Sequence, residues 1–255
     1  MIDTHCHLYD PVYDADRSEV LQRAEQAGVT DFLMPGVDSS NYAAMMDTAA
    51  KYPQCRAMIG LHPTSIDKSW QQELDFVKDK LATAPPNTFI AIGEIGMDTY
   101  WSKEFLAEQK AVFSAMLALA TAHNLPVVIH SRDAFPETFE VLQQHPHSLR
   151  GVFHAFSGDF ETYKKIRQFG DFKVGVGGVI TFKNAHLPEA VKDIPLHDIL
   201  LETDAPYLTP APFRGKRNES AYLTYIVQKI AEVKQITVDE VMAVTTQNAK
   251  ALFWG

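Results

Sequence analysis

Short apolar runs alternate with helix-like segments from one end of this 255-residue chain to the other. Residues 89–92 and 127–129 are continuously apolar, which is typical of parallel strands covered on both faces. Segments between such runs, for example residues 17–27 and 104–123, place apolar side chains at helical spacing. This alternation predicts repeated strand–helix units in an α/β fold with a parallel sheet.

The strand candidates begin near residues 2, 30, 56, 88, 125, 151, 171 and 199. Eight strand–helix units in a chain of this length predict a (β/α)8 TIM barrel. The eighth helix is expected over residues 222–233, and an extra C-terminal helix over 237–253, with Thr237 as its N-cap and Glu240 at the capping-box position. A doubly wound open sheet is the alternative. Because no low-complexity stretch divides the chain, we expect one domain over residues 1–255.

The chain carries 23 basic and 32 acidic residues, a net charge of −9. Such a charge opposes non-specific binding to duplex DNA, although a local basic patch or bound cations can still create a nucleic-acid site. Cys6 and Cys55 are too few for a disulfide framework and suit a reducing compartment. The start of the chain lacks the pattern of a secretory signal, and the longest apolar stretch, residues 111–122, is too short for a bilayer. We therefore expect a cytoplasmic protein without membrane contact.

Six side chains that can bind metals each come at the end of a predicted strand. They are His5, His7, Glu94, His130, His154 and Asp204. Because His5 and His7 are two residues apart, both imidazoles lie on the same face of the strand. In a barrel, the C-terminal ends of all strands meet at the face where active sites lie. Any one of these residues alone could be a hydrogen-bonded rim residue, but buried imidazoles and carboxylates are costly unless paired or metal-bound. Together they predict a metal centre.

The sequence also resembles the TatD family of metal-dependent deoxyribonucleases, a branch of the amidohydrolase-like barrels. The matching motifs are DTHCHL (residues 3–8), GLHP (60–63), GEIGMD (93–98), HSR (130–132), HAFSG (154–158), ETDAPYL (202–208) and RGKRNE (214–219). Two positions depart from the family pattern. Thr99 stands where an aromatic residue is usual, and Ser220 stands where proline is usual. We expect both departures to affect substrate preference rather than chemistry.

The resemblance implies two divalent metal ions per chain, which could be Mg, Mn or Zn. The implied ligands are His5, His7 and Asp204 for one ion, His130 and His154 for the other, and Glu94 as a bridge between them. Glu94 and Asp204 are then the catalytic residues. Asp204 would orient a water molecule and take its proton.

Residues expected to bind substrate are less strongly marked. His62, at the end of the third strand, could donate to a phosphate oxygen or be a rim histidine. Arg132 could bind phosphate through its planar fork or form a structural ion pair. Arg217 and Asn218 belong to the densest basic segment, residues 214–218, which could guide phosphates or simply be solvated.

Three further side chains could contribute to the site. Tyr100 and Trp101 could stack on a base or only pack against neighbours. Glu202 shares a strand face with Asp204 and could hold a metal ligand in position.

The expected function is therefore hydrolysis of DNA phosphodiester bonds, by an exonuclease acting on single-stranded or frayed DNA. The expected partner is DNA, with no obligate protein partner. The alternative is a metal-dependent hydrolase of an amide, lactone or aminoacyl ester on the same barrel, because fold does not fix substrate. A non-enzymatic binding module is disfavoured, because all six ligand positions are present.

Overall fold

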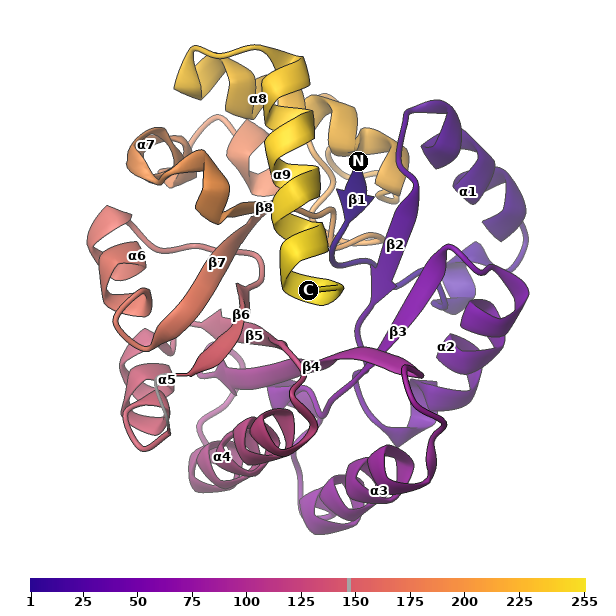
Figure 1. Ribbon diagram of the computed structural model, residues 1–255, viewed down its shortest axis with the longest axis vertical. Coiled ribbons are helices and arrows are strands. Elements are labelled where there is room, and N and C mark those ends of the chain that lie inside the picture. The colour runs from indigo at the N-terminus through magenta and orange to yellow at the C-terminus, as the bar shows by residue number, and fades with distance from the viewer. Residues whose placement is uncertain (146–147) are drawn as a thin grey trace.

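The computed structural model describes residues 1–145 and 148–255, and in this part of the chain eight parallel strands alternate with helices around a barrel (Figure 1). The strands are β1 (Ile2–Asp3), β2 (Asp31–Met34), β3 (Cys55–Ile59), β4 (Phe89–Asp98), β5 (Val127–Arg132), β6 (Leu149–Phe153), β7 (Gly170–Val176) and β8 (Ile199–Leu201). The helices are α1 (Arg17–Gln26), α2 (Ser39–Lys51), α3 (Trp70–Thr83), α4 (Leu106–His123), α5 (Phe135–Leu142), α6 (Phe160–Ile166), α7 (Leu187–Asp193), α8 (Leu223–Lys234) and α9 (Val238–Phe253).

The sheet follows chain order, since each strand pairs in parallel with the next from β1 to β8. The first and last strands of the sheet are joined by hydrogen bonds of the residues that follow β1 and β8. The Thr4 N–H donates to the Leu201 carbonyl at 3.0 Å, and the Asp204 N–H donates to the His5 carbonyl at 2.9 Å. These bonds close the barrel and confirm the predicted (β/α)8 fold with its extra C-terminal helix.

Helix α9 covers the end of the barrel at which the strands begin (Figure 1). Leu252 and Phe253 pack with apolar side chains from the barrel interior, including Ile2 and Val128. The helix begins as predicted, because the Thr237 hydroxyl accepts the Glu240 N–H at 3.1 Å. With this end filled, the opposite end is left for a cavity.

A second, larger apolar cluster fills the space between the strands and the surrounding helices. It packs the helices against the outer face of the barrel. Among the described residues, no helix combines the length and apolar composition needed to span a membrane.

Candidate metal centre

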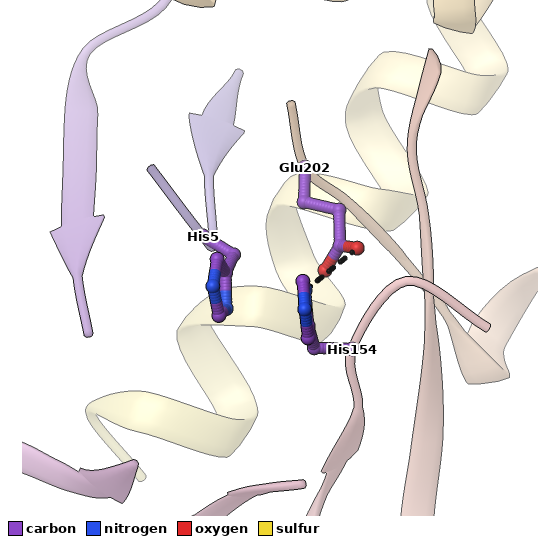
Figure 2. A group of neighbouring side chains, drawn as sticks. All are labelled: His5, His154 and Glu202. Carbon is purple, nitrogen blue, oxygen red and sulfur yellow. Dashed lines mark ion pairs between the residues drawn. The ribbon is translucent and has the colours of Figure 1, made fainter. Parts of the chain in front are cut away.

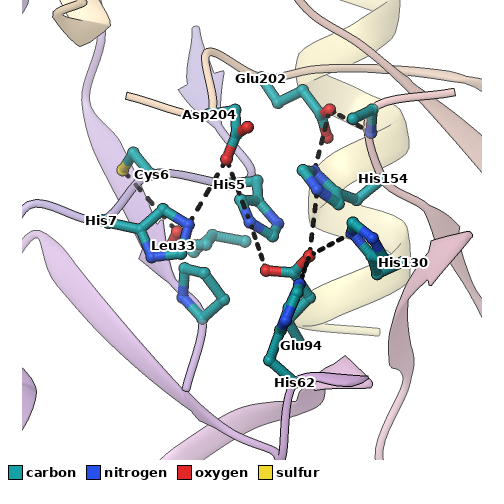
Figure 3. Close-up of polar contacts among 12 residues, drawn as sticks. His5, Cys6, His7, Leu33, His62, Glu94, His130, His154, Glu202 and Asp204 are labelled. Carbon is teal, nitrogen blue, oxygen red and sulfur yellow. Dashed lines mark hydrogen bonds and ion pairs between the residues drawn. The ribbon is translucent and has the colours of Figure 1, made fainter. Parts of the chain in front are cut away.

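A cavity of about 710 Å³ lies at the C-terminal ends of the strands and is lined by five of the six predicted ligands. The sixth, His5, is fully buried against Glu94 and Asp204 (Figure 3). The six residues come from five separate strands: His5 and His7 follow β1, Glu94 lies in β4, His130 lies in β5, His154 follows β6 and Asp204 follows β8. Parallel strands bring residues that are distant in sequence to one face of the barrel.

Glu94 lies at the centre of this group and is only 3% exposed. Its Oε2 is 3.2 Å from His5 Nε2, and its Oε1 is 2.9 Å from His130 Nδ1. The same Oε1 is 3.2 Å from His154 Nε2 and 3.2 Å from His62 Nε2. Burial alone would raise the pKa of Glu94, but the surrounding imidazoles hold it well below its usual range. The carboxylate is therefore charged and faces imidazoles through both oxygens.

Asp204 faces the other side of the cavity. Its Oδ1 is 3.4 Å from His7 Nε2 and 3.7 Å from His5 Nε2. Burial alone would raise the pKa of Asp204, but its contact with His7 and the nearby imidazoles outweigh burial, so the pKa lies below its usual value. The backbone at Asp204 has a φ of 56°, an uncommon conformation for a residue with a side chain and one that is often found at functional sites.

The described residues contain three groups of possible metal ligands, and within each group the ligand atoms all lie within 4.8 Å of one another. They are His5, His7 and Asp204; His62, Glu94 and His130; and His5, His154 and Glu202. The first is the predicted set for one ion. The second contains His62, which sequence reasoning assigned to substrate rather than metal, so the outer contacts of each imidazole must decide which ring can be a ligand.

His7 has the tautomer that a metal ligand needs. The Tyr9 hydroxyl donates its only proton to the Pro35 carbonyl at 2.7 Å. It therefore accepts from His7 Nδ1, which lies 3.0 Å away. A neutral His7 then carries its proton on Nδ1 and presents the Nε2 lone pair to the cavity, as metal-bound histidines do.

His130 is oriented in the same way by a carboxylate. Its Nε2 hydrogen-bonds Asp98 Oδ2 at 2.9 Å. Burial would raise the pKa of Asp98, but this hydrogen bond lowers it, so Asp98 is ionised and can only accept. A neutral His130 ring therefore has its lone pair on Nδ1, which faces Glu94.

His154 has a carboxylate on its outer side as well. Its Nδ1 lies 3.2 Å from Glu202 Oε1, and the same oxygen accepts the Ala155 N–H at 2.5 Å. Figure 2 shows Glu202 against the His154 ring, with the His5 ring on the other side. The rings of His5 and His154 are stacked, with centroids 3.6 Å apart. Glu202 therefore occupies the supporting position that the sequence suggested for it.

His62 differs, because its outer nitrogen accepts a hydrogen bond. The Thr64 N–H donates to His62 Nδ1 at 3.1 Å. Burial lowers the pKa of His62, which favours a neutral ring. The Thr64 hydroxyl also lies 2.7 Å from Nδ1 and can donate to the same lone pair. With Nδ1 as acceptor, a neutral ring carries its proton on Nε2, the atom that faces Glu94 and the cavity. His62 is therefore placed as a hydrogen-bond donor and not as a metal ligand.

The residues present fit a cation. Both ring nitrogens of His5 are buried and have no hydrogen-bond partner among the described residues. Its Nε2 points between the carboxylates of Glu94 and Asp204 (Figure 3). A buried polar atom without a partner is costly. A divalent ion among these atoms would satisfy it, since imidazole and carboxylate are common metal ligands.

Arg132 lines the cavity, as expected for a phosphate contact. Its guanidinium carbon lies 3.7 Å above the centre of the Tyr100 ring. Within the described residues it forms no ion pair, so the structural ion pair considered from the sequence is absent.

Arg217 and Asn218, in contrast, do not line this cavity. Arg217 pairs with Asp16 at 2.6 Å and with Glu219 at 3.1 Å. The Asn218 amide donates to the carbonyls of Thr203 and Tyr207, at 2.8 and 2.6 Å. Both residues therefore fasten the loop that carries Asp204, and their assignment to substrate stays a prediction without geometric support.

Sequence reasoning missed the roles of Asp98 and Tyr9, which orient two of the imidazoles. It also missed Asp3, which is fully buried and accepts from the Thr203 hydroxyl and N–H at 2.6 and 3.0 Å. Asp3 and Asp98 lie inside the recognised motifs. Their proximity to the ligands was the available signal.

Comparison with known proteins agrees with this arrangement. A model of the family described as TatD related DNase matches residues 2–254. An uncharacterized metal-dependent hydrolase of Bacillus subtilis, YabD, is 39% identical over 255 residues, covering 99% of this chain and 98% of that protein. The crystal structure of YJJV, a TatD homologue from Escherichia coli, matches with a TM-score of 0.93 and 31% identity, covering 100% of this chain and 98% of that one.

A more distant structure shows likeness of fold alone. The phosphotriesterase homology protein of Escherichia coli matches with a TM-score of 0.73 at 14% identity, over 99% of this chain and 98% of that one.

Proposed function

This chain belongs to the TatD related DNase family, and we propose that it hydrolyses DNA phosphodiester bonds as an exonuclease on single-stranded or frayed ends. Family membership makes it a metal-dependent hydrolase. The observation that carries the proposal is Glu94, which lies 2.9–3.2 Å from the three candidate ligands His5, His130 and His154, with one oxygen toward His5 and the other toward His130 and His154. A carboxylate so placed is suited to bridge two cations.

We propose two divalent ions, which bound here would lower the pKa of a water molecule and neutralise phosphate charge. The residues that would hold them are His5, His7 and Asp204 on one side, His130 and His154 on the other, and Glu94 between. Four imidazoles favour Zn or Mn over Mg, which prefers oxygen ligands.

Three side chains of the cavity would act on the substrate. Asp204 is ionised and reaches the cavity, so it can orient the attacking water and accept its proton. His62 presents an Nε2–H that can donate to a phosphate oxygen. Arg132 offers a planar fork without a carboxylate partner in the described residues, which suits a phosphate.

The test is a product assay with metal-loaded protein on labelled single-stranded DNA, RNA of the same sequence, an aryl ester, a lactone and an amide. We expect the DNA to be cut. Glu94→Gln protein, purified identically, excludes a contaminating nuclease and should be inactive. Hydrolysis of the ester, lactone or amide with intact DNA would replace the proposal by hydrolysis of that bond.

A further inference from the structure

Two large aromatic side chains are exposed beside the metal centre. Tyr100 is 52% exposed and Trp101 is 70% exposed. Their rings meet edge to face, with centroids 4.9 Å apart, and Trp101 lines the cavity. Exposed apolar surface that adjoins a cavity is characteristic of a ligand site. We call these two residues the aromatic pair.

The backbone of the aromatic pair is fixed by a residue that also orients the metal centre. Asp98 Oδ1 accepts the Tyr100 N–H at 3.0 Å and the Trp101 N–H at 3.4 Å. The other oxygen, Oδ2, hydrogen-bonds His130 Nε2 at 2.9 Å. One carboxylate thus sets the position of a metal ligand and of the aromatic pair. The distance between them is therefore built into the fold.

Neighbouring contacts fasten the same segment to β5. The Thr99 N–H donates to the Arg132 carbonyl at 3.1 Å, and the Thr99 hydroxyl donates to the Asp133 carbonyl at 2.5 Å. Thr99 is therefore buried, whereas the next two residues are exposed and the second of them, Trp101, lines the cavity. A rigid backbone reduces the entropy that a ligand loses on binding.

Arg132 completes the arrangement. Its guanidinium stacks 3.7 Å above the Tyr100 ring and lies 5.4 Å from the centre of the Trp101 ring. Stacking holds the guanidinium plane in place while its N–H edges remain available for an anion. Aromatic faces and a phosphate-binding fork therefore lie next to each other at the mouth of the cavity.

We propose that Tyr100, Trp101 and Arg132 form a stacking subsite for the nucleobase adjoining the phosphate at the metal centre. The ligand is a nucleotide of single-stranded DNA, because its base face is free, whereas bases in a duplex are covered by their neighbours. Every base has a π-face, so the subsite is tolerant of sequence. This inference rests on the proposed function and names a subsite of it.

The experiment compares two single-stranded oligonucleotides, one with all bases and one with abasic residues at both ends. The kcat/KM is measured on both for wild type, Trp101→Ala, Trp101→Phe and Trp254→Ala. Trp254 is the matched control, because it is also exposed (43%) but follows α9 at the other end of the barrel.

We expect wild type to prefer the substrate with bases by about tenfold. Trp101→Ala should lose that preference by losing rate on this substrate alone, Trp101→Phe should keep part of it, and Trp254→Ala should match wild type. The proposal is overturned if wild type cleaves both substrates equally, or if Trp101→Ala loses equal rate on both.

A binding measurement separates this inference from the proposed function. Quenching of tryptophan fluorescence is titrated with a deoxynucleoside monophosphate and with deoxyribose phosphate, which has no base. If no DNA is cut, the proposed function fails, yet quenching by the nucleotide alone that disappears in Trp101→Ala would still establish the subsite. Quenching that is equal for both compounds or persists in Trp101→Ala would reject the subsite.

Discussion

At the residue scale, the outer contact of each imidazole determines what the ring can do. His7 and His130 donate outward, to Tyr9 and Asp98, and so present lone pairs to the cavity. His62 accepts from the Thr64 N–H and so presents a proton. The outer contacts thereby divide these histidines into candidate metal ligands and a candidate hydrogen-bond donor to substrate.

This division predicts different losses for two histidine variants. His130→Ala should lose one metal ion, because it removes a ligand. His62→Ala should retain both ions while turnover falls by roughly ten- to a hundredfold, the effect of a lost hydrogen bond to a charged group. Elemental analysis of each purified variant, combined with kcat on single-stranded DNA, measures both effects. A His62→Ala protein that is short of one ion would show that His62 is a ligand.

The sequence predicted that the six candidate ligands would come together, because these residues follow strands and strand ends converge. It could not predict the tautomers, because they depend on contacts such as that of Tyr9 with Pro35. Arg217 shows the converse. Its charge suggested a phosphate contact, but its partner Asp16 lies 201 residues away, and only the folded chain reveals the pairing.

At the element scale, β4 carries two carboxylates of the site, Glu94 at its centre and Asp98 against His130. Its apolar run at residues 89–92 predicted a strand, but the strand continues to Asp98 and pairs with β5 as far as Arg132. The register shifts between Gly93 and Ile95, where the apolar pattern is interrupted. The sequence predicted Glu94 at this site, but it did not predict that the strand would extend to Asp98, whose carboxylate contacts both His130 and the backbone of the aromatic pair.

Strand β7 supports the site through a close approach of its backbone to Glu202. A Cβ added at Gly175 would lie 2.1 Å from Glu202 Oε2, whereas one added at Gly177 would lie 3.4 Å or more from its neighbours. Gly175→Ala must therefore displace the carboxylate that contacts His154. Gly177→Ala is the matched control.

We expect Gly175→Ala to weaken metal affinity by roughly ten- to a hundredfold, which is the usual effect of losing a residue that supports a metal ligand. Gly177→Ala should bind metal like wild type. Competition with a chelator measures the affinity, and circular dichroism verifies that both variants are folded. Unchanged affinity in folded Gly175→Ala would remove Glu202 from the account of the site.

At the scale of the whole molecule, access to the site is one-sided. Helix α9 fills one end of the barrel, and the cavity opens at the other. The chain carries a net charge of −9, so few positions outside the cavity attract DNA. Affinity should come from a small number of phosphate contacts near Arg132.

This geometry favours a flexible single strand over a stiff duplex. We predict that labelled single-stranded DNA is cut faster than blunt duplex of the same sequence. With one or two phosphate contacts, the logarithm of affinity should fall with the logarithm of salt concentration at a slope of about −1. Side-by-side digestion and binding at several salt concentrations test both points. Equal rates on the two substrates would refute the access argument.

The most direct test of the central claim counts metal ions and DNA hydrolysis on the same sample. Wild type and Glu94→Gln are stripped with a chelator and titrated with Mn or Zn, while bound ions per chain and the rate on single-stranded DNA are followed together. The account predicts two ions in wild type and hydrolysis that requires the second. For Glu94→Gln it predicts that the hydrolysis rate falls by more than about hundredfold, which is the effect of removing a residue that only supports a metal ligand. Full hydrolysis with one ion per chain, or substantial turnover by folded, metal-loaded Glu94→Gln, would contradict it.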